Sequence, residues 1–206
     1  MERCSLALLV PLLIACAPAA FAASSTDLSV TGLITPSACT PSLSGGGIVN
    51  HGKVTVKDLR PDQPTALDNG TLYLEVNCDG ATPFTLTTID NREGTSAIHP
   101  NSHGLGAIND DQNLGSVALG LFDTVADGVA VKPIISLNNG ATWRVSSYLG
   151  HAGRTGFAAL SDLSTPIAIK DLRARLTAFT TIVRANDLTL TDEIPIDGHV
   201  TVQLNY

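Results

Sequence analysis

The sequence contains few charged and few aromatic residues. Charged residues make up 15% of the 206 residues and aromatic residues 4%, with a single tryptophan and a single methionine. Such a low charge content argues against coiled coils and helical bundles, whose exposed faces carry many charged side chains. Basic residues are also scarce, because 12 Lys and Arg stand against 19 Asp and Glu, for a formal charge of −7. A nucleic-acid-binding protein needs a basic surface, so no nucleic-acid partner is expected.

Long apolar runs are missing after residue 22. Residues 1–22 have the layout of a secretory signal peptide, in which Arg3 precedes an apolar stretch and Ala20-Phe21-Ala22 provides a cleavage site. The apolar stretch is too short to cross a bilayer as a mature helix. We therefore predict export from the cytoplasm, removal of residues 1–22, and a single mature domain over residues 23–206 with no transmembrane segment.

Cysteine is rare as well. Of the four cysteines, Cys4 and Cys16 lie within the predicted signal peptide, so Cys39 and Cys78 remain in an oxidising compartment. A disulfide between them closes a loop of about 40 residues, worth on the order of 4 kcal/mol by the chain-entropy estimate. Their neighbours provide no base that would favour a reactive thiolate, so we predict a structural disulfide. A lipobox-like sequence ending at Cys16 leaves lipoprotein anchoring through this residue as an alternative.

Apolar and polar residues alternate in many short segments that are separated by Gly, Pro, Asn and Asp. This two-residue period is typical of β-strands, and about nine such segments favour an all-β fold with a β-sandwich architecture. A helical pattern is weak and confined to residues 168–178. The strand candidates are residues 28–34, 53–57, 71–76, 84–89, 116–123, 134–137, 141–147, 166–170, 173–184 and 198–206, and the two segments within 166–184 could form one long kinked strand.

No catalytic motif is present. The sequence lacks a Gly-x-Ser-x-Gly elbow and a phosphate-binding Gly-Lys-Ser. His99 and His103 lie close together, but Pro100 prevents a helix that would align them as zinc ligands. Residues 109–113 (NDDQN) carry oxygen ligands without the spacing of a calcium loop. We therefore expect no enzyme activity, no catalytic residue, no cofactor and no metal site.

Two features could nevertheless bind a ligand. Residues 90–115 form a predicted loop rich in Gly, Asn, Asp and His, which is longer than most connections in a compact domain. Trp143 could stack on a sugar ring, although a single tryptophan in a β-sandwich is more often part of the core. The alternative function is therefore a soluble carbohydrate-binding module of the periplasm or cell surface.

Several motifs occur in order along the chain, together with the cysteine spacing and a terminal alternating strand that ends in Tyr206. The motifs are residues 30–41 (VTGLITPSACTP), 90–92 (DNR), 104–106 (GLG), 140–143 (GATW) and 196–198 (IDG). They resemble a family of uncharacterised, fimbrial-like secreted proteins of Gram-negative bacteria, classified as a domain of unknown function. This family in turn resembles the pilin subunits of the chaperone–usher pathway.

The resemblance implies an immunoglobulin-like, pilin-like β-sandwich that lacks its final strand. It implies a structural subunit of the periplasm or of surface fimbriae that serves adhesion, with a periplasmic chaperone, an usher and other fimbrial subunits as partners. Assembly would proceed by donor-strand complementation, in which a segment of another chain completes the sheet. The implied contact residues are Val200, Val202, Leu204 and Tyr206 on the last strand, and Leu28, Val30 and Gly32 in the donor segment.

The resemblance also implies that Cys39 and Cys78 join the first strand to the strand ending at Val76. Two features depart from the pilin pattern, because Tyr206 is the last residue rather than the penultimate one and the stretch before Cys39 is short. If residues 28–34 formed the protein's own first strand, only residues 23–27 would remain for donation. A self-complemented sandwich that does not polymerise is therefore a further alternative.

Overall fold

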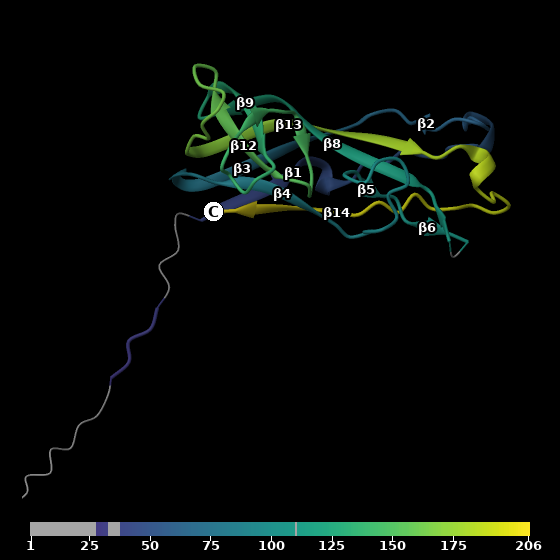
Figure 1. Cartoon of the computed structure of the whole chain (residues 1–206), viewed down its shortest axis with the longest axis horizontal. Helices are drawn as coiled ribbons and strands as arrows, with labels where there is room; N and C mark the ends of the chain where they lie inside the picture. The colour runs from purple at the N-terminus through teal and green to yellow at the C-terminus, as the bar shows by residue number, and fades with distance from the viewer. Residues whose placement is uncertain (1–27, 33–37, 110) are drawn as a thin grey trace, which may run out of the picture. The chain divides into compact units, whose positions relative to one another are not determined.

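The computed structural model describes residues 28–32, 38–109 and 111–206 (Figure 1). The chain divides into two units, with the boundary between Ile34 and Thr35. In the first unit, the described residues 28–32 contain no helix or strand. The predicted signal peptide lies outside the described residues. In the described part of the chain, no helix is long and apolar enough to span a membrane.

The second unit is all-β, as predicted. Its short 3₁₀ turns are η1 (Ser44–Gly47), η2 (Val56–Asp58) and η3 (Ala185–Asp187). The strands are β1 (Cys39–Leu43), β2 (Thr65–Ala66), β3 (Gly70–Thr82), β4 (Thr85–Asp90), β5 (His103–Gly104), β6 (Ala107–Ile108), β7 (Gln112–Asn113), β8 (Gly115–Ala126), β9 (Val129–Ser136), β10 (Arg144–Val145), β11 (Tyr148–Leu149), β12 (Arg154–Ala159), β13 (Ile169–Ile182) and β14 (Val200–Asn205).

The main strands follow one antiparallel path in the order β1-β3-β13-β8-β9-β12-β4-β14. The first four strands form one layer and the last four form the other. The two layers are joined where β8 and β9 meet, through the pairs Val125–Ala130 and Ala126–Val129. Within the described residues, β1 pairs only with β3 and β14 only with β4. The sheet therefore nearly closes on itself, with β1 and β14 as its outermost strands.

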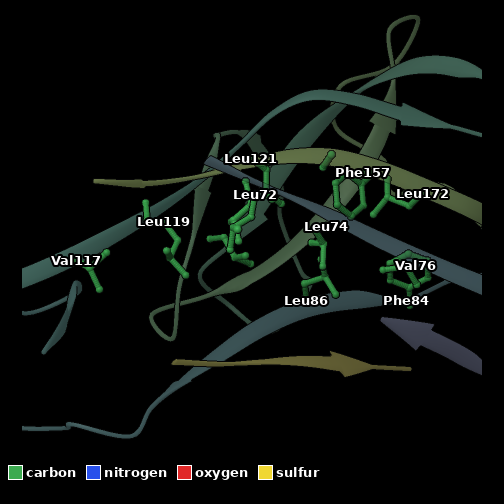
Figure 2. Packing of buried hydrophobic residues seen from close by; sticks show 14 of the residues in the cluster. Leu72, Leu74, Val76, Phe84, Leu86, Val117, Leu119, Leu121, Phe157 and Leu172 are labelled. Atoms are coloured by element: carbon green, nitrogen blue, oxygen red, sulfur yellow. The ribbon is translucent and has the colours of Figure 1, made fainter. Parts of the chain in front are cut away.

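The core lies between the layers and follows from the two-residue period of the strands. On β3, Leu74 and Val76 are fully buried, whereas the alternate residues Tyr73 and Glu75 face outward. Leu86 of β4 and Phe157 of β12 bring side chains of the opposite layer into the same cluster (Figure 2). Burial of each such side chain contributes about 1.5–3 kcal/mol, which makes this cluster the main source of stability.

The disulfide forms as predicted and ties the first two strands of the path together. Cys39 and Cys78 are bonded, and they also face each other in the β1–β3 register. The bond therefore holds the edge strand β1 to the central strand β3, beside the strand segment that ends at Val76.

The long strand β13 confirms the prediction of one kinked strand in place of two. Its pairing with β8 shifts register between Arg173 and Arg175, which marks an irregularity of the ladder. The weak helix prediction for residues 168–178 is wrong, because Leu172, Ala174 and Leu176 are buried at every second position.

Other strand predictions need correction. Residues 53–57 form no strand but lead into η2, where Thr55 donates its backbone N–H and its hydroxyl to Asp58. Residues 28–32 carry no strand either, while residues 33 and 34 lie outside the description. Only Arg144 and Val145 of the candidate 141–147 are in a strand. The longer strands β1 and β12 were not predicted, because Pro, Gly and Ser interrupt their alternation. The two-residue strands β2, β5, β6, β7 and β11 were not predicted either.

Candidate functional site: a groove between the edge strands

A groove runs between the two edge strands of the sheet, β1 and β14. Its inner part has a volume of about 150 Å³ and lies between the β1–η1 segment and β14. Its floor is formed by the inward-facing side chains of β13 and β8. The residues that define this part are Leu43, Leu119, Leu176, Ala178, Val200 and Val202.

The outer part of the groove is larger, with a volume of about 670 Å³. Its two lips are residues 48–56 and 190–196, and its floor includes Leu114 and Ile182. Apart from Val56 at the start of η2, neither lip belongs to a helix or strand. Because Val49, His51 and Ile196 line both parts, the two parts form one continuous groove.

One end of the groove is bridged. The backbone N–H of Cys39, at the start of β1, donates to the hydroxyl of Tyr206, 2.8 Å away. The C-terminus of the chain accordingly lies beside the start of β1 (Figure 1). The groove is thus closed at the end where β14 finishes and widens toward residues 190–196.

The lining is mainly aliphatic, with one polar pair on its floor. His51 Nε2 and Thr180 Oγ1 are 2.9 Å apart. At the rim, Lys53 Nζ lies 3.6 Å from Glu193 Oε1, so an ion pair spans the two lips. Both of these side chains are highly exposed, and the pair therefore adds little to stability. The groove is suited to an extended apolar segment rather than to a charged ligand.

The residues predicted on the last strand lie at different places. Val200 and Val202 line the inner groove. Leu204 lies on the same face of β14, is half-buried against the core and pairs with Leu86 of β4. Their contact with a chaperone or another subunit stays a prediction. Tyr206 is largely exposed and contributes the hydroxyl at the closed end.

The residues predicted in the donor segment are exposed. Leu28 and Val30 each have 89% of their surface accessible, although both are aliphatic. Gly32 has no atom within 4 Å of the position that a Cβ would take.

Trp143, predicted as a possible ligand-binding residue, contacts both its own loop and strand β12. Its indole Nε1–H donates to the carbonyl of Gly140 at 3.1 Å. Its ring lies so close to Gly156 of β12 that a Cβ there would be 3.2 Å from the ring. The residue as a whole is partly exposed.

The predicted long loop is partly ordered by contacts with the segment that leads into β14. Residues 90–115 include β5, β6 and β7, and Arg92 Nη2 lies 2.6 Å from Asp197 Oδ2. His103 is buried against Thr88, whereas His99 accepts a hydrogen bond from the backbone N–H of Asn101. In the described parts of the chain, no three His, Cys, Asp or Glu side chains converge as metal ligands would.

The sequence did not predict the outer part of the groove or the contact between His51 and Thr180. Leu190, Ile194 and Ile196 were not assigned to any strand, and their apolar character in an otherwise polar connection was the available signal. His51 carried no signal at all, since a single histidine between Asn50 and Gly52 has no motif.

Comparison with known proteins places the chain near proteins of unknown function. Residues 28–118 match a family described as "Protein of unknown function (DUF1120)". The chain resembles that family across its N-terminal half. This agrees with the predicted resemblance to a domain of unknown function.

Two relatives from Escherichia coli (strain K12) are similar over most of their length. Protein GltF is 28% identical, and the alignment covers 91% of this chain and 92% of the relative. The uncharacterized protein YhcF is 24% identical, with 88% and 90% covered. Each alignment therefore covers about nine-tenths of the chain, and neither name states an activity.

Proposed function

We propose that this protein is a fimbrial-like structural subunit whose sheet is completed by a strand from another polypeptide. The observation that carries the proposal is the apolar groove between the edge strands β1 and β14. Unpaired strand edges promote uncontrolled association unless they are covered. An inserted strand would cover both edges and would bury the aliphatic floor between them.

The inserted strand would be recognised in two ways. Its backbone N–H and C=O groups would pair with the edges, which provides affinity, and its alternate side chains would fill the groove, which provides specificity. A periplasmic chaperone would occupy the groove after export, and a second subunit delivered through an usher would replace it. The completed protein would then reside in a surface fimbrium and serve adhesion.

The exposed segment at residues 28–32 is the natural candidate for the donated strand. Leu28 and Val30 are aliphatic, lie two residues apart and are each 89% exposed. Residues 28–32 form no strand with the described residues of their own chain, so donation of this segment would break no described strand pairing.

Paired aspartate substitutions on the two faces of the donor segment test this proposal. Leu28→Asp with Val30→Asp should abolish self-association of the mature protein, because charged side chains cannot enter an aliphatic groove. Ser29→Asp with Thr31→Asp carries the same charge on the opposite face and should leave association intact. Light scattering coupled to size-exclusion chromatography measures the oligomeric state of each variant at matched concentrations.

The proposal fails if the unsubstituted mature protein refolds reversibly at high concentration and stays monomeric. It fails equally if both aspartate pairs weaken association to the same extent, because the effect would then reflect charge rather than side-chain insertion.

A further inference from the structure

Aromatic and arginine side chains gather on one outer face of the sheet, although the chain has only five Phe, three Tyr and one Trp. On β13, Arg173, Arg175 and Phe179 alternate with buried core residues and therefore point outward. Tyr73 of β3 and Phe122 of β8 pair with Arg175 in the register of the two neighbouring strands. We call these five residues the aromatic–arginine face.

The side chains of this face stack on one another. Arg173 Cζ lies 4.8 Å from the centre of the Tyr73 ring. Arg175 Cζ lies 5.0 Å from the centre of the Phe122 ring. The rings of Phe122 and Phe179 meet edge to face, with 6.2 Å between their centroids. Such contacts hold long side chains in one arrangement, so a ligand would find the face already organised.

Two local features of β8 shape the face. Gly120 lets the two phenylalanines meet, because a Cβ there would be 2.8 Å from Phe122 and 3.3 Å from Phe179. Asp123 has a positive φ of 49° and lies where the pairing of β8 with β13 shifts register. This bulge brings its Oδ2 to 2.7 Å from Nε of Arg175. Backbone conformations of this kind are concentrated at functional sites.

Both arginines of the face are paired with carboxylates. In addition to the pair formed by Asp123, Arg173 Nε lies 3.5 Å from Oε1 of Glu75. The face therefore has no net formal charge, although the chain carries −7. An anionic ligand would meet the two carboxylates and a cationic ligand the two arginines. An uncharged ligand with many hydroxyl groups can use both the donors and the acceptors.

We propose that the aromatic–arginine face binds an uncharged oligosaccharide. The apolar C–H faces of hexose rings would stack on Tyr73 and Phe179, which are 43% and 37% exposed. Sugar hydroxyl groups would accept hydrogen bonds from Arg173 and donate to Asp123. From Arg173 to Phe179 the strand extends about 20 Å at its usual rise per residue, which is longer than one sugar ring.

This inference goes beyond the proposed function and does not depend on strand addition. The floor of the groove is formed by the inward side of β13 and β8, whereas the aromatic–arginine face lies on their outward side. The face also differs from the carbohydrate site predicted at Trp143, which contacts Gly156 of β12 in the other layer. A subunit could thus hold a glycan whether or not its groove is filled.

Glycan binding by the full mature protein tests the inference. The probes are an array of uncharged hexose and N-acetylhexosamine oligomers, with sialylated and sulfated glycans beside them. Calorimetry then gives the Kd of each oligomer that binds and of its monosaccharide. We expect an uncharged oligomer to bind about tenfold or more tightly than its monosaccharide, because several side chains of the row would contact it.

Substitution of the rings locates the binding site. Tyr73→Thr and Phe179→Thr remove a ring but keep a residue favoured in strands, and each should weaken binding about fivefold to tenfold. Phe179→Trp keeps a ring and should stay within about threefold. Leu160→Thr removes an exposed apolar side chain elsewhere and is the matched control. Melting temperatures establish that each variant is folded, and Phe179→Leu replaces Phe179→Thr if the latter is unfolded.

A charge substitution tests why the ligand is uncharged. Asp123→Asn keeps a residue type that tolerates a positive φ and leaves the face with one positive charge. Binding of the sulfated probes should then increase about threefold or more relative to the unsubstituted protein.

The outcomes separate this inference from strand addition. Loss of binding in both ring variants, with the Leu160→Thr control unchanged, supports it. The inference is overturned if no uncharged probe binds, if the unsubstituted protein prefers sulfated probes, or if the ring variants bind as tightly as the unsubstituted protein. In the last case, loss of binding in Trp143→Ala would place the ligand on the other layer. None of these results bears on self-association, which tests the proposed function.

Discussion

His103 is a fully buried titratable residue outside the groove. Its Nε2 lies 2.7 Å from the hydroxyl of Thr88 and its Nδ1 lies 3.3 Å from the carbonyl of Val117. A neutral ring satisfies both contacts, because one nitrogen donates to the carbonyl and the other accepts from the hydroxyl. The ring also packs edge-to-face on His151, with 5.3 Å between centroids.

Burial is the main cause that lowers the pKa of His103 below its ordinary value of 6.5. The nearby His151 lowers this pKa further, whereas the hydrogen bond to the Val117 carbonyl and the charge of Asp90 raise it. The net direction is downward, so the folded protein holds this histidine neutral under conditions where the unfolded chain binds a proton.

This difference predicts a loss of stability in mild acid. As the pH falls below about 6.5, the unfolded chain takes up the proton first, so the free energy of unfolding decreases until the folded-state pKa is passed. His103→Gln removes the titrating group and should show a smaller decrease between about pH 7.5 and about pH 5. Urea unfolding at the two pH values measures the difference, and an equal decrease in both proteins would contradict it.

At the scale of single elements, the disulfide gives β1 its position at the edge. Within the part of the chain that the structure describes, β1 pairs with β3 alone, and Cys39 is joined to Cys78 across a separation of 39 residues. Without this bond the short strand would depend on contacts such as its hydrogen bonds with β3, the partial burial of Leu43 and the hydrogen bond from Cys39 to Tyr206.

Removal of the disulfide should therefore be strongly destabilising. The chain-entropy estimate for a loop of this length is about 4 kcal/mol of unfolding free energy. Urea unfolding of the Cys39→Ser, Cys78→Ser double variant measures the loss, with the unsubstituted protein in reducing agent as a check on the cause. A change below about 1 kcal/mol would show that β1 is held by other contacts.

Elements with buried faces were predictable, and elements whose neighbours decide their conformation were not. β3, β4, β13 and β14 follow from alternation, since one face of each of the first three strands is inside the core and the alternate residues of β14 are partly buried. Residues 53–57 alternate in the same way, yet Val54 and Val56 line the open groove and meet no partner strand. Alternation reports which side chains share a face, and it does not report whether another strand lies alongside.

The same limit applies to the site. Val200 and Val202 could be predicted because they belong to a regular strand with apolar residues on one face. The place of His51 in the groove could not be predicted, because it depends on the contact with Thr180, which is 129 residues away along the chain. Only the packing of the loop after η1 against β13 brings the two together.

At the scale of the whole molecule, a strand supplied from within the chain should convert an associating protein into a stable monomer. Tyr206 lies at the closed end of the groove, so a short turn and a copy of residues 27–34 appended after it could run back along β14. Burial of Leu28 and Val30 from this copy should raise the melting temperature, by roughly 2–4 °C for each kcal/mol gained.

Calorimetry and light scattering measure the two effects together. The matched control carries aspartate in place of Leu28 and Val30 in the appended copy alone, and it should associate and melt as the unsubstituted protein does. An appended copy that leaves both properties unchanged would argue against insertion into this groove.

The contact between Tyr206 and Cys39 has a consequence for larger assemblies. It places the start of β1 and the last residue of the chain at the same end of the sheet, while the groove extends away from that end. If a segment of one copy enters the groove of another, as proposed, the contact is heterologous, because the surface that gives differs from the surface that receives. Repetition of such a contact would produce a ring or an open-ended filament, and reciprocal exchange between two copies would close a symmetric pair.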